Sequence, residues 1–206
     1  MQRLFRNNAQ WQARKIARDP DFFARLAKQQ SPDYLWIGCA DSRVPANDIV
    51  DLDPGEVFVH RNVANVVVPS DMNLLAVLQY AVDALQVREI VVAGHYGCGG
   101  VKAALERSGL SFVDTWLRPI HETYAANRDE LDALPGTEAR VNRLCELHVQ
   151  QQVHNVAATT IVQDAWARGQ SLGVNGVIYD HADGHLRDLE CRLTSAAEAA
   201  AQAVWA

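Results

Sequence analysis

Residues Glu89-Ile90-Val91-Val92-Ala93-Gly94 form the strongest strand signal in the sequence. The run is apolar throughout its interior, as in central parallel strands that are covered on both faces. Three further strands are predicted at 34–39, 56–60 and 172–179, and a short antiparallel strand at 186–190 follows the Asp183-Gly184 turn. Helical patterns alternate with these strands. The chain is therefore predicted to be an α/β protein, with about four parallel strands plus an antiparallel edge strand, flanked by helices.

The helical segments divide into an N-terminal arm and a set that alternates with the strands. Residues 2–18 and 20–29 are predicted as two helices of an arm over 1–30, which packs on the body or on a partner subunit. Further helices are predicted at 71–86 with Ser70 as the cap, at 101–107, at 115–130, over 137–168 with a break near His154-Asn155, and at 195–205. No linker divides the chain, so 1–206 is expected to be a single domain.

Composition limits the classes of function. The chain has 206 residues, 49% of them hydrophobic and 21% charged, which predicts a folded domain. The net charge of −6 argues against nucleic-acid binding through general charge. No apolar run approaches the roughly 20 residues that span a membrane. The polar start argues against a secretory signal, and a first segment that is rich in Asn and Gln argues against a transit peptide. A cytoplasmic protein is expected.

Three potential metal ligands follow two of the predicted strands. Cys39 ends the strand at 34–39, and His95 and Cys98 follow the strand at 89–94. Ligands gather at the carboxyl ends of parallel strands, so these side chains are expected at one edge of the sheet. Two thiolates and one imidazole make an open zinc site with a position left for water or substrate. A closed structural site with a fourth ligand from elsewhere is the alternative.

The remaining cysteines and two late histidines are assigned no role in this site. Cys145 and Cys191 are expected to be small buried residues. His181 and His185 flank the Asp183-Gly184 turn and are expected on the surface of a hairpin.

An acid and a base lie beside the first thiolate, at Asp41 and Arg43. Asp41 can ligate the metal itself, or it can turn away and accept a hydrogen bond from a metal-bound water. The planar guanidinium of Arg43 suits a two-point contact with a carboxylate. If Arg43 holds Asp41 off the metal, the fourth position is open. The alternative is a surface ion pair worth less than ~1 kcal/mol.

These motifs resemble those of the β-class carbonic anhydrases. The resemblance rests on Cys39-x-Asp41-x-Arg43, on His95-x-x-Cys98-Gly99-Gly100 and on Phe58–Asn65, and it extends from the arm to about Tyr179. It implies one Zn²⁺ per chain bound by Cys39, His95 and Cys98. It also implies reversible hydration of carbon dioxide to bicarbonate and a proton by zinc-bound hydroxide, in a dimer that is often paired into a tetramer. Two thiolates cancel the zinc charge, so activity is predicted to rise toward alkaline pH.

A second residue set resembles the bicarbonate-regulated (type II) subclass of that family. Trp36, Arg61 and Tyr179 stand at the places of its signature. The resemblance implies that bicarbonate and low pH stabilise a closed state in which Asp41 is the fourth zinc ligand. In the alternative interpretation, Trp36 and Tyr179 are core aromatics and Arg61 serves a salt bridge.

Two other functions stay open at this point. Relatives with the same zinc site can hydrolyse carbon disulfide or carbonyl sulfide. A zinc-binding regulatory protein without turnover is the other alternative, although a structural site has no use for the Asp41–Arg43 pair. A cysteine-based hydrolase or redox protein is disfavoured, because the sequence has no Cys-x-x-Cys motif.

Overall fold

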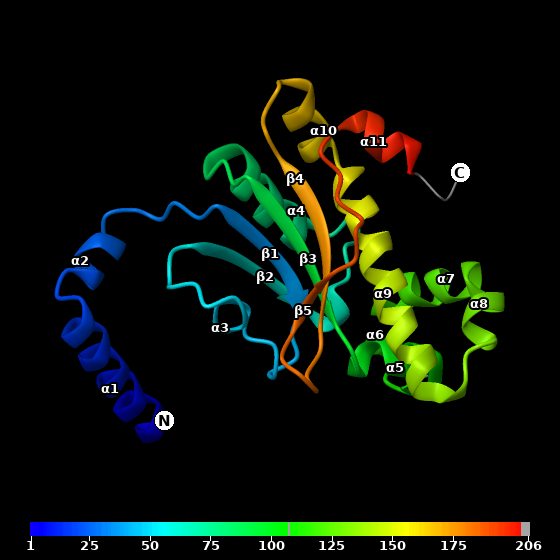
Figure 1. Cartoon of the computed structure of the whole chain (residues 1–206), viewed down its shortest axis with the longest axis horizontal. Helices are drawn as coiled ribbons and strands as arrows, with labels where there is room; N and C mark the ends of the chain where they lie inside the picture. The colour runs from blue at the N-terminus through cyan, green and yellow to red at the C-terminus, as the bar shows by residue number, and fades with distance from the viewer. Residues whose placement is uncertain (107, 203–206) are drawn as a thin grey trace.

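A five-stranded sheet lies at the centre of the molecule (Figure 1). The computed structural model describes residues 1–106 and 108–202. The strand order is β2-β1-β3-β4-β5. Four strands run parallel, and these are β1 (Tyr34–Cys39), β2 (Val57–Asn62), β3 (Glu89–His95) and β4 (Gly173–Tyr179). The antiparallel edge strand is β5 (Leu186–Asp188). The predicted fold class is confirmed, and β3 occupies the central position expected from its apolar sequence.

Helices connect and cover the strands. They are α1 (Gln2–Arg18), α2 (Phe22–Leu26), α3 (Ala46–Ile49), α4 (Met72–Gln79), α5 (Gly99–Glu106), α6 (Ser111–Trp116), α7 (Arg118–Ala126), α8 (Arg128–Asp132), α9 (Gly136–Ala157), α10 (Thr160–Ala167) and α11 (Ala196–Ala201). A short 3₁₀ turn at Val63–Asn65 follows β2, and a π-helical turn at Tyr80–Ala84 follows α4. Arg107 and residues 203–205, at the ends of two predicted helices, lie outside the described residues.

Helix α9 packs closely on β3 and β4 because each strand has a glycine, without a side chain, at the point where it contacts the helix. A Cβ added to Gly94 of β3 would lie 2.5 Å from Cγ2 of Val149, and one on Gly176 of β4 would lie 3.0 Å from Cγ1 of the same valine. The buried positions of α9 recur at the three- and four-residue spacing of one helix face, at Val141, Leu144, Cys145, His148, Val149, Gln152, Val153 and Val156. This face includes two polar residues, and both contact the loop after β2.

The arm extends away from the sheet. Helix α1 stands to one side in Figure 1, and none of its residues is buried. Its Trp11 packs edge-on against Phe22 and Phe23 of α2, with ring centroids 6.4 and 5.6 Å apart. Leu4 and Phe5 remain 60% and 66% exposed. The predicted arm is present, and its apolar residues near the N-terminus are left uncovered by this copy of the chain.

Three predicted helix boundaries differ from the structure. The break predicted near His154-Asn155 occurs at Ala158 and Thr159, where the Thr159 hydroxyl accepts from the Val162 amide and starts α10. The cap predicted at Ser70 is instead Asp71, whose carboxylate accepts from the Asn73 amide. The helix predicted at 115–130 is divided into α6, α7 and α8. No helix within residues 1–106 and 108–202 has the length and apolar character needed to cross a membrane.

Candidate metal centre

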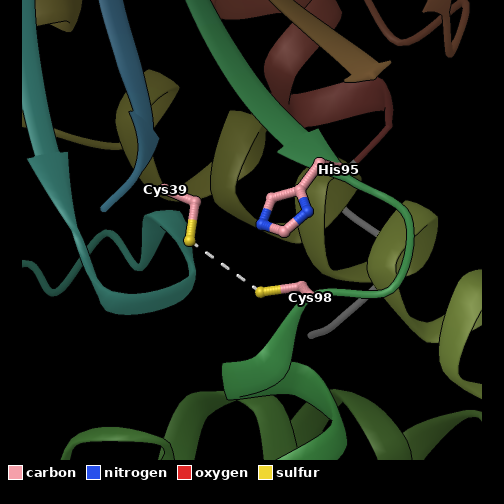
Figure 2. A group of neighbouring side chains, drawn as sticks. All are labelled: Cys39, His95 and Cys98. Atoms are coloured by element: carbon pink, nitrogen blue, oxygen red, sulfur yellow. Dashed lines mark hydrogen bonds between the residues drawn. The ribbon is translucent and has the colours of Figure 1, made fainter. Parts of the chain in front are cut away.

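Three buried side chains converge at the carboxyl edge of the sheet. Cys39 ends β1, His95 ends β3, and Cys98 follows a turn in which Gly97 adopts a left-handed φ of 62° (Figure 2). The ligand atoms of the three residues lie within 4.8 Å of one another. The parallel register places β1 beside β3, so residues 56 positions apart in the sequence meet as predicted.

The geometry of this cluster fits a zinc ion. Tetrahedral zinc with Zn–S bonds of about 2.3 Å places two sulfurs about 3.8 Å apart. The Sγ atoms of Cys39 and Cys98 are 3.9 Å apart. The Nδ1 atom of His95 is 3.0 Å from the Tyr96 carbonyl, which can only accept, so Nδ1 carries the proton. The remaining nitrogen, Nε2, is buried and has no protein partner, which leaves its lone pair free for a metal.

The electrostatics of the two thiols also favour a cation. The adjacent Cys98 thiol, followed by the nearby imidazole of His95, lowers the pKa of Cys39 to about 4 despite its burial. The neighbouring Cys39 and the burial of the thiol raise the pKa of Cys98 far above its usual range. Two thiols this close cannot both ionise unless a cation lies between them. The site therefore has one ready thiolate and a second that a divalent metal would ionise.

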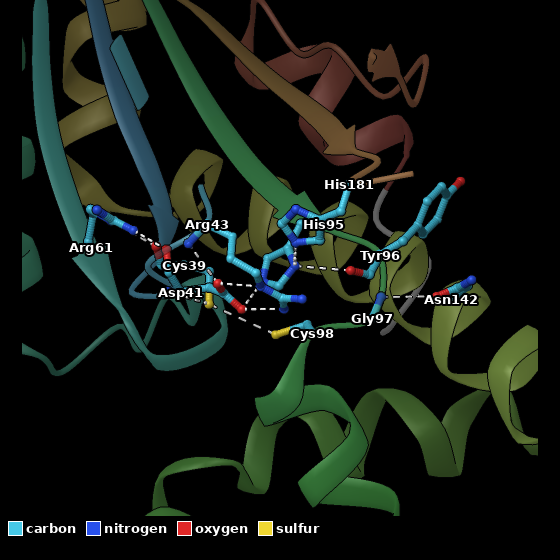
Figure 3. A network of polar contacts seen from close by, with 10 residues as sticks. All are labelled: Cys39, Asp41, Arg43, Arg61, His95, Tyr96, Gly97, Cys98, Asn142 and His181. Atoms are coloured by element: carbon cyan, nitrogen blue, oxygen red, sulfur yellow. Dashed lines mark hydrogen bonds and ion pairs between the residues drawn. The ribbon is translucent and has the colours of Figure 1, made fainter. Parts of the chain in front are cut away.

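Asp41 lies at the edge of the cluster and is held by Arg43. The Arg43 Nε and Nη2 atoms are 2.9 and 2.7 Å from the two carboxylate oxygens of Asp41, and the Arg43 amide is 2.9 Å from Oδ1 (Figure 3). These contacts, led by the Arg43 side chain, hold the pKa of Asp41 well below its usual range. The Oδ2 atom remains 3.8 Å from Nε2 of His95. Asp41 is thus an ionised hydrogen-bond acceptor that faces the cluster while Arg43 holds it in place.

Arg61 contacts the backbone that carries these residues. Its guanidinium donates to the carbonyl oxygens of Cys39, at 2.8 Å, and of Asp41. Trp36 is buried with Ala46 and Ala93, and its indole covers Gly38 so closely that a Cβ there would overlap the ring. Tyr179 pairs with His95 across β4 and β3. Strand pairing and the alternation of side chains place Trp36, Arg61 and Tyr179 on one face of the sheet.

One residue expected on the surface lies against a ligand. The Nε2 atom of His181 is 3.0 Å from Nδ1 of His95, and the two rings are 4.9 Å apart. His181 lies in the hairpin turn as expected, but its side chain is half-buried against His95 and not fully on the surface, whereas the side chain of His185 is 75% exposed. A sequence signal was available, because His181 lies two residues beyond the predicted strand at 172–179, and ligands gather at the carboxyl ends of parallel strands. Cys145 and Cys191 are buried, as predicted.

Comparisons with known proteins agree with this centre. The family model described as carbonic anhydrase matches residues 34–186. A carbonic anhydrase of Emericella nidulans is 48% identical over 187 residues, which cover 91% of this chain and 82% of that protein.

Two solved structures share the fold over nearly the whole chain. A tetrameric β-carbonic anhydrase of Sordaria macrospora is 38% identical, with a TM-score of 0.89 and coverage of 94% of this chain and 98% of that one. A Coccomyxa β-carbonic anhydrase in complex with acetazolamide is 39% identical, with a TM-score of 0.90 and coverage of 96% and 90%. With its family match, its sheet order and its Cys-His-Cys cluster at the sheet edge, the chain belongs to the β-class carbonic anhydrases.

Proposed function

We propose that the chain catalyses the reversible hydration of carbon dioxide to bicarbonate and a proton, with one Zn²⁺ bound by Cys39, His95 and Cys98. The observation that carries this proposal is the cluster of three buried ligand atoms beside an ionised carboxylate held off by an arginine. Bound zinc supplies a Lewis acid that lowers the pKa of a water in its fourth position. Three protein ligands leave that position open, which a purely structural zinc site does not do.

Asp41 and Arg43 have distinct roles in this reaction. The ionised carboxylate of Asp41 can only accept hydrogen bonds, so it orients a hydroxyl proton away from the carbon that is attacked. Arg43 occupies both carboxylate oxygens and keeps Asp41 at a distance from the three ligand atoms. The pair therefore sets both the orientation of the reacting oxygen and the openness of the fourth position.

A direct comparison of substrates tests this function. The purified zinc-loaded protein is mixed with carbon dioxide in a stopped-flow instrument, and hydrolysis of carbon disulfide and carbonyl sulfide is measured on the same sample. Rapid hydration of carbon dioxide with a rate that rises toward alkaline pH is expected. Turnover of carbon disulfide or carbonyl sulfide alone would favour the hydrolase. One zinc per chain without turnover of any of the three would favour the regulatory protein.

We further propose that bicarbonate and low pH inhibit the enzyme through a closed state in which Asp41 is the fourth ligand. Support comes from Arg61, which bonds the backbone at Cys39 and Asp41 and lies on the same sheet face as Trp36 and Tyr179. An oxyanion held by the Arg61 guanidinium, the Trp36 indole N–H and the Tyr179 hydroxyl would compete for these bonds. Freed backbone at Asp41 would let its carboxylate leave Arg43 and turn to the ligands.

A bicarbonate titration tests this regulation. Because bicarbonate would bind only the closed state, cooperative inhibition that is stronger at low pH is expected. The double variant Trp36→Val with Tyr179→Phe should lose the cooperativity and retain the uninhibited rate. Simple inhibition that is unchanged in the double variant would exclude the site.

The assembly is proposed to be a dimer or a dimer of dimers. Residues 1–18 carry five positive charges and no acid, so the net charge of −6 leaves −11 for residues 19–206. The exposed Leu4 and Phe5 add apolar surface to this basic arm, which suits the acidic body of a second copy. A groove of about 600 Å³ beside Trp36, Val91 and Val177 offers apolar surface on the open sheet face.

Two further expectations remain proposals. We treat 1–206 as a single domain, with the arm as a dimer contact. A cytoplasmic location is proposed because two metal-binding thiols suit a reducing compartment.

A further inference from the structure

The two residues between His95 and Cys98 form a turn that sets the spacing of these ligands. Gly97 has a φ of 62°, in the left-handed region, and lies on the surface. A Cβ added there would meet nothing within 4 Å, so glycine serves the backbone conformation and not close packing. Glycine also loses more conformational freedom on folding than any other residue. Burial of Gly97 therefore does not fix this turn, and contacts from elsewhere must hold it.

The amide of Gly97 donates to a side chain of α9. Its nitrogen is 3.1 Å from Oδ1 of Asn142, a residue 45 positions later in the chain (Figure 3). A backbone N–H can only donate, so the side-chain oxygen of Asn142 accepts. The carbonyl of the same peptide unit, that of Tyr96, accepts from Nδ1 of His95 at 3.0 Å. One peptide plane thus links Asn142 to the ring of a ligand.

The planarity of this peptide couples its two hydrogen bonds. Resonance keeps the N–H and the C=O of a trans peptide in one rigid plane, where they point in opposite directions. A rotation of the plane that takes the Gly97 N–H away from Asn142 therefore also turns the Tyr96 carbonyl away from His95. Carbonyl partners of this kind fix the tautomer and the ring orientation of a metal-binding histidine. Asn142 thus acts on the orientation of His95 through the peptide.

The side chain of Tyr96 anchors the same turn to the same helix. Its hydroxyl is 2.5 Å from Oε1 of Glu146, and it points away from the ligands in Figure 3. The other carboxylate oxygen of Glu146 accepts from Nη1 of Arg143 at 2.8 Å, and Nε of Arg143 is 2.5 Å from Oε1 of Glu130 in α8. Hydrogen bonds to an ionised carboxylate are stronger than those between neutral groups. The turn is therefore held both by its backbone and by its side chain.

Asn142 and Glu146 continue the stripe of α9 that packs on the sheet. With Val149 and Val153 they are spaced by four, three and four residues, which places all of them on one side of the helix. A Cβ added to Gly176 of β4 would lie 3.0 Å from Val149 and 3.1 Å from Val153. The stripe thus rests on the sheet at one end and reaches the turn after β3 at the other. Its polar end is positioned by the apolar packing.

We propose that Asn142 and Glu146 are positioning residues for the metal centre. They fix the Tyr96–Gly97 peptide and the Tyr96 side chain from α9, and so hold the His95 ring and the Cys98 thiol at the spacing that zinc requires. The inference rests on the proposed zinc site. The effect of both residues passes through the turn, as is usual for groups that orient metal ligands from outside the coordination shell.

Substitutions at two positions test the two contacts separately. Asn142→Leu removes the acceptor of the Gly97 amide at similar volume, whereas Asn142→Asp keeps an acceptor of the same shape. Tyr96→Phe removes only the hydroxyl that donates to Glu146. Recovery in Asn142→Asp of what is lost in Asn142→Leu separates the hydrogen bond from packing.

Two variants away from the turn are matched controls. Gln151→Leu removes an amide of α9 that donates to Asn155 at 3.0 Å, and Tyr124→Phe removes a hydroxyl that donates to Asp132 at 2.6 Å. The readouts are the zinc dissociation constant against a chromogenic chelator and the thiolate-to-metal absorption band of the Co²⁺-loaded protein. The band reports the geometry of the ligands, which a general loss of stability would not move.

The expected pattern is specific. Asn142→Leu should weaken zinc binding about 10- to 100-fold and move the thiolate band, and Tyr96→Phe should weaken zinc binding about 10-fold. Asn142→Asp should stay close to the unmodified protein, and the controls should change neither readout. A folded Asn142→Leu variant with both readouts unchanged, or an Asn142→Asp variant as weak as Asn142→Leu, would overturn the role of Asn142. Unchanged zinc binding in Tyr96→Phe would overturn the role of Glu146. A missing thiolate band in the unmodified protein would instead overturn the proposed zinc site.

A measurement on the unmodified chain covers the case in which Asn142→Leu does not fold. In the metal-free protein, the Gly97 amide should exchange its hydrogen more slowly than the same amide in an unstructured peptide, because Asn142 accepts its N–H. Exchange at the unstructured rate, followed by NMR, would overturn the inference.

Discussion

Among single residues, the Asp41–Arg43 pair is proposed to give the cluster its catalytic activity. Asp41→Asn keeps the shape of the side chain and removes its charge, so an ionised acceptor no longer orients the reacting oxygen. Zinc content should be unchanged and kcat/KM for carbon dioxide should fall by about 100-fold, the usual scale for a lost proton-handling group. The pair of Asp183 with Arg187 on the hairpin supplies the control, since Asp183→Asn removes a similar but distant contact and should leave the rate unchanged. Full activity in Asp41→Asn would contradict this role.

His181 offers a second comparison between residues. Its contact at 3.0 Å with Nδ1 of His95 fixes the orientation of the ligand ring from outside the cluster. His181→Ala should therefore weaken zinc retention about 10-fold in a chelator competition, and His185→Ala, on the exposed side of the same turn, should not. Equal zinc retention in the two variants would show that the contact has no effect on the ligand.

The convergence of the three candidate ligands could be predicted from the sequence, and the buried hydrogen bonds between α9 and the loop after β2 could not. Cys39, His95 and Cys98 follow predicted strands, and the rule for parallel sheets places them at one edge. His148 and Gln152 lie in a long helix, where their spacing of four residues is the same as that of any buried pair. No sequence pattern indicates that their side chains form hydrogen bonds with Ala64 and Val67, which lie 84 and 85 positions earlier in the chain. Long-range hydrogen bonds leave no local pattern.

At the scale of elements, the contact between α9 and β3 depends on Gly94. A Cβ at this position would lie 2.5 Å from Cγ2 of Val149 and 3.1 Å from Cδ1 of Ile178, so Gly94→Ala overpacks the core. The expected loss of stability is about 1–3 kcal/mol, and each kcal/mol lowers Tm by about 2–4 °C in a chain of this size. Gly99→Ala is the control, because a Cβ there meets nothing within 4 Å. A Tm of the Gly94→Ala variant equal to that of the unmodified protein would contradict the close packing of α9 on β3.

The strands were easier to predict than the turns between elements. β1 and β3 are apolar runs bounded by polar turns, and their ranges agree with the prediction to within a residue. The left-handed pair Ala64 and Asn65 carries no glycine, so its backbone could not be predicted from residue type. The division of the segment at 137–168 occurs where Thr159 caps α10, four residues beyond Asn155, near which the pattern places the break.

At the scale of the whole molecule, the uncovered arm predicts how copies associate. Leu4 and Phe5 are exposed within one copy, so the double variant Leu4→Glu with Phe5→Glu should leave the fold of the protomer intact. In a contact between copies, the two new carboxylates would lose their water, and the association should weaken. Light scattering after size-exclusion chromatography should give a smaller mass than that of the unmodified protein. Gln10→Glu with Gln12→Glu adds the same charge at exposed polar positions of α1 and should not change the mass. An unchanged mass for the first variant would exclude the arm as a contact.

Two thiolates and one imidazole are proposed to hold zinc with one position open. X-ray absorption at the zinc edge of the purified protein measures this coordination shell. Two sulfur neighbours are expected at about 2.3 Å and two lighter neighbours at about 2.0–2.1 Å, one from His95 and one from water or Asp41. A shell of four sulfurs, which would require Cys145 and Cys191 as ligands, or a shell without sulfur, would contradict this coordination.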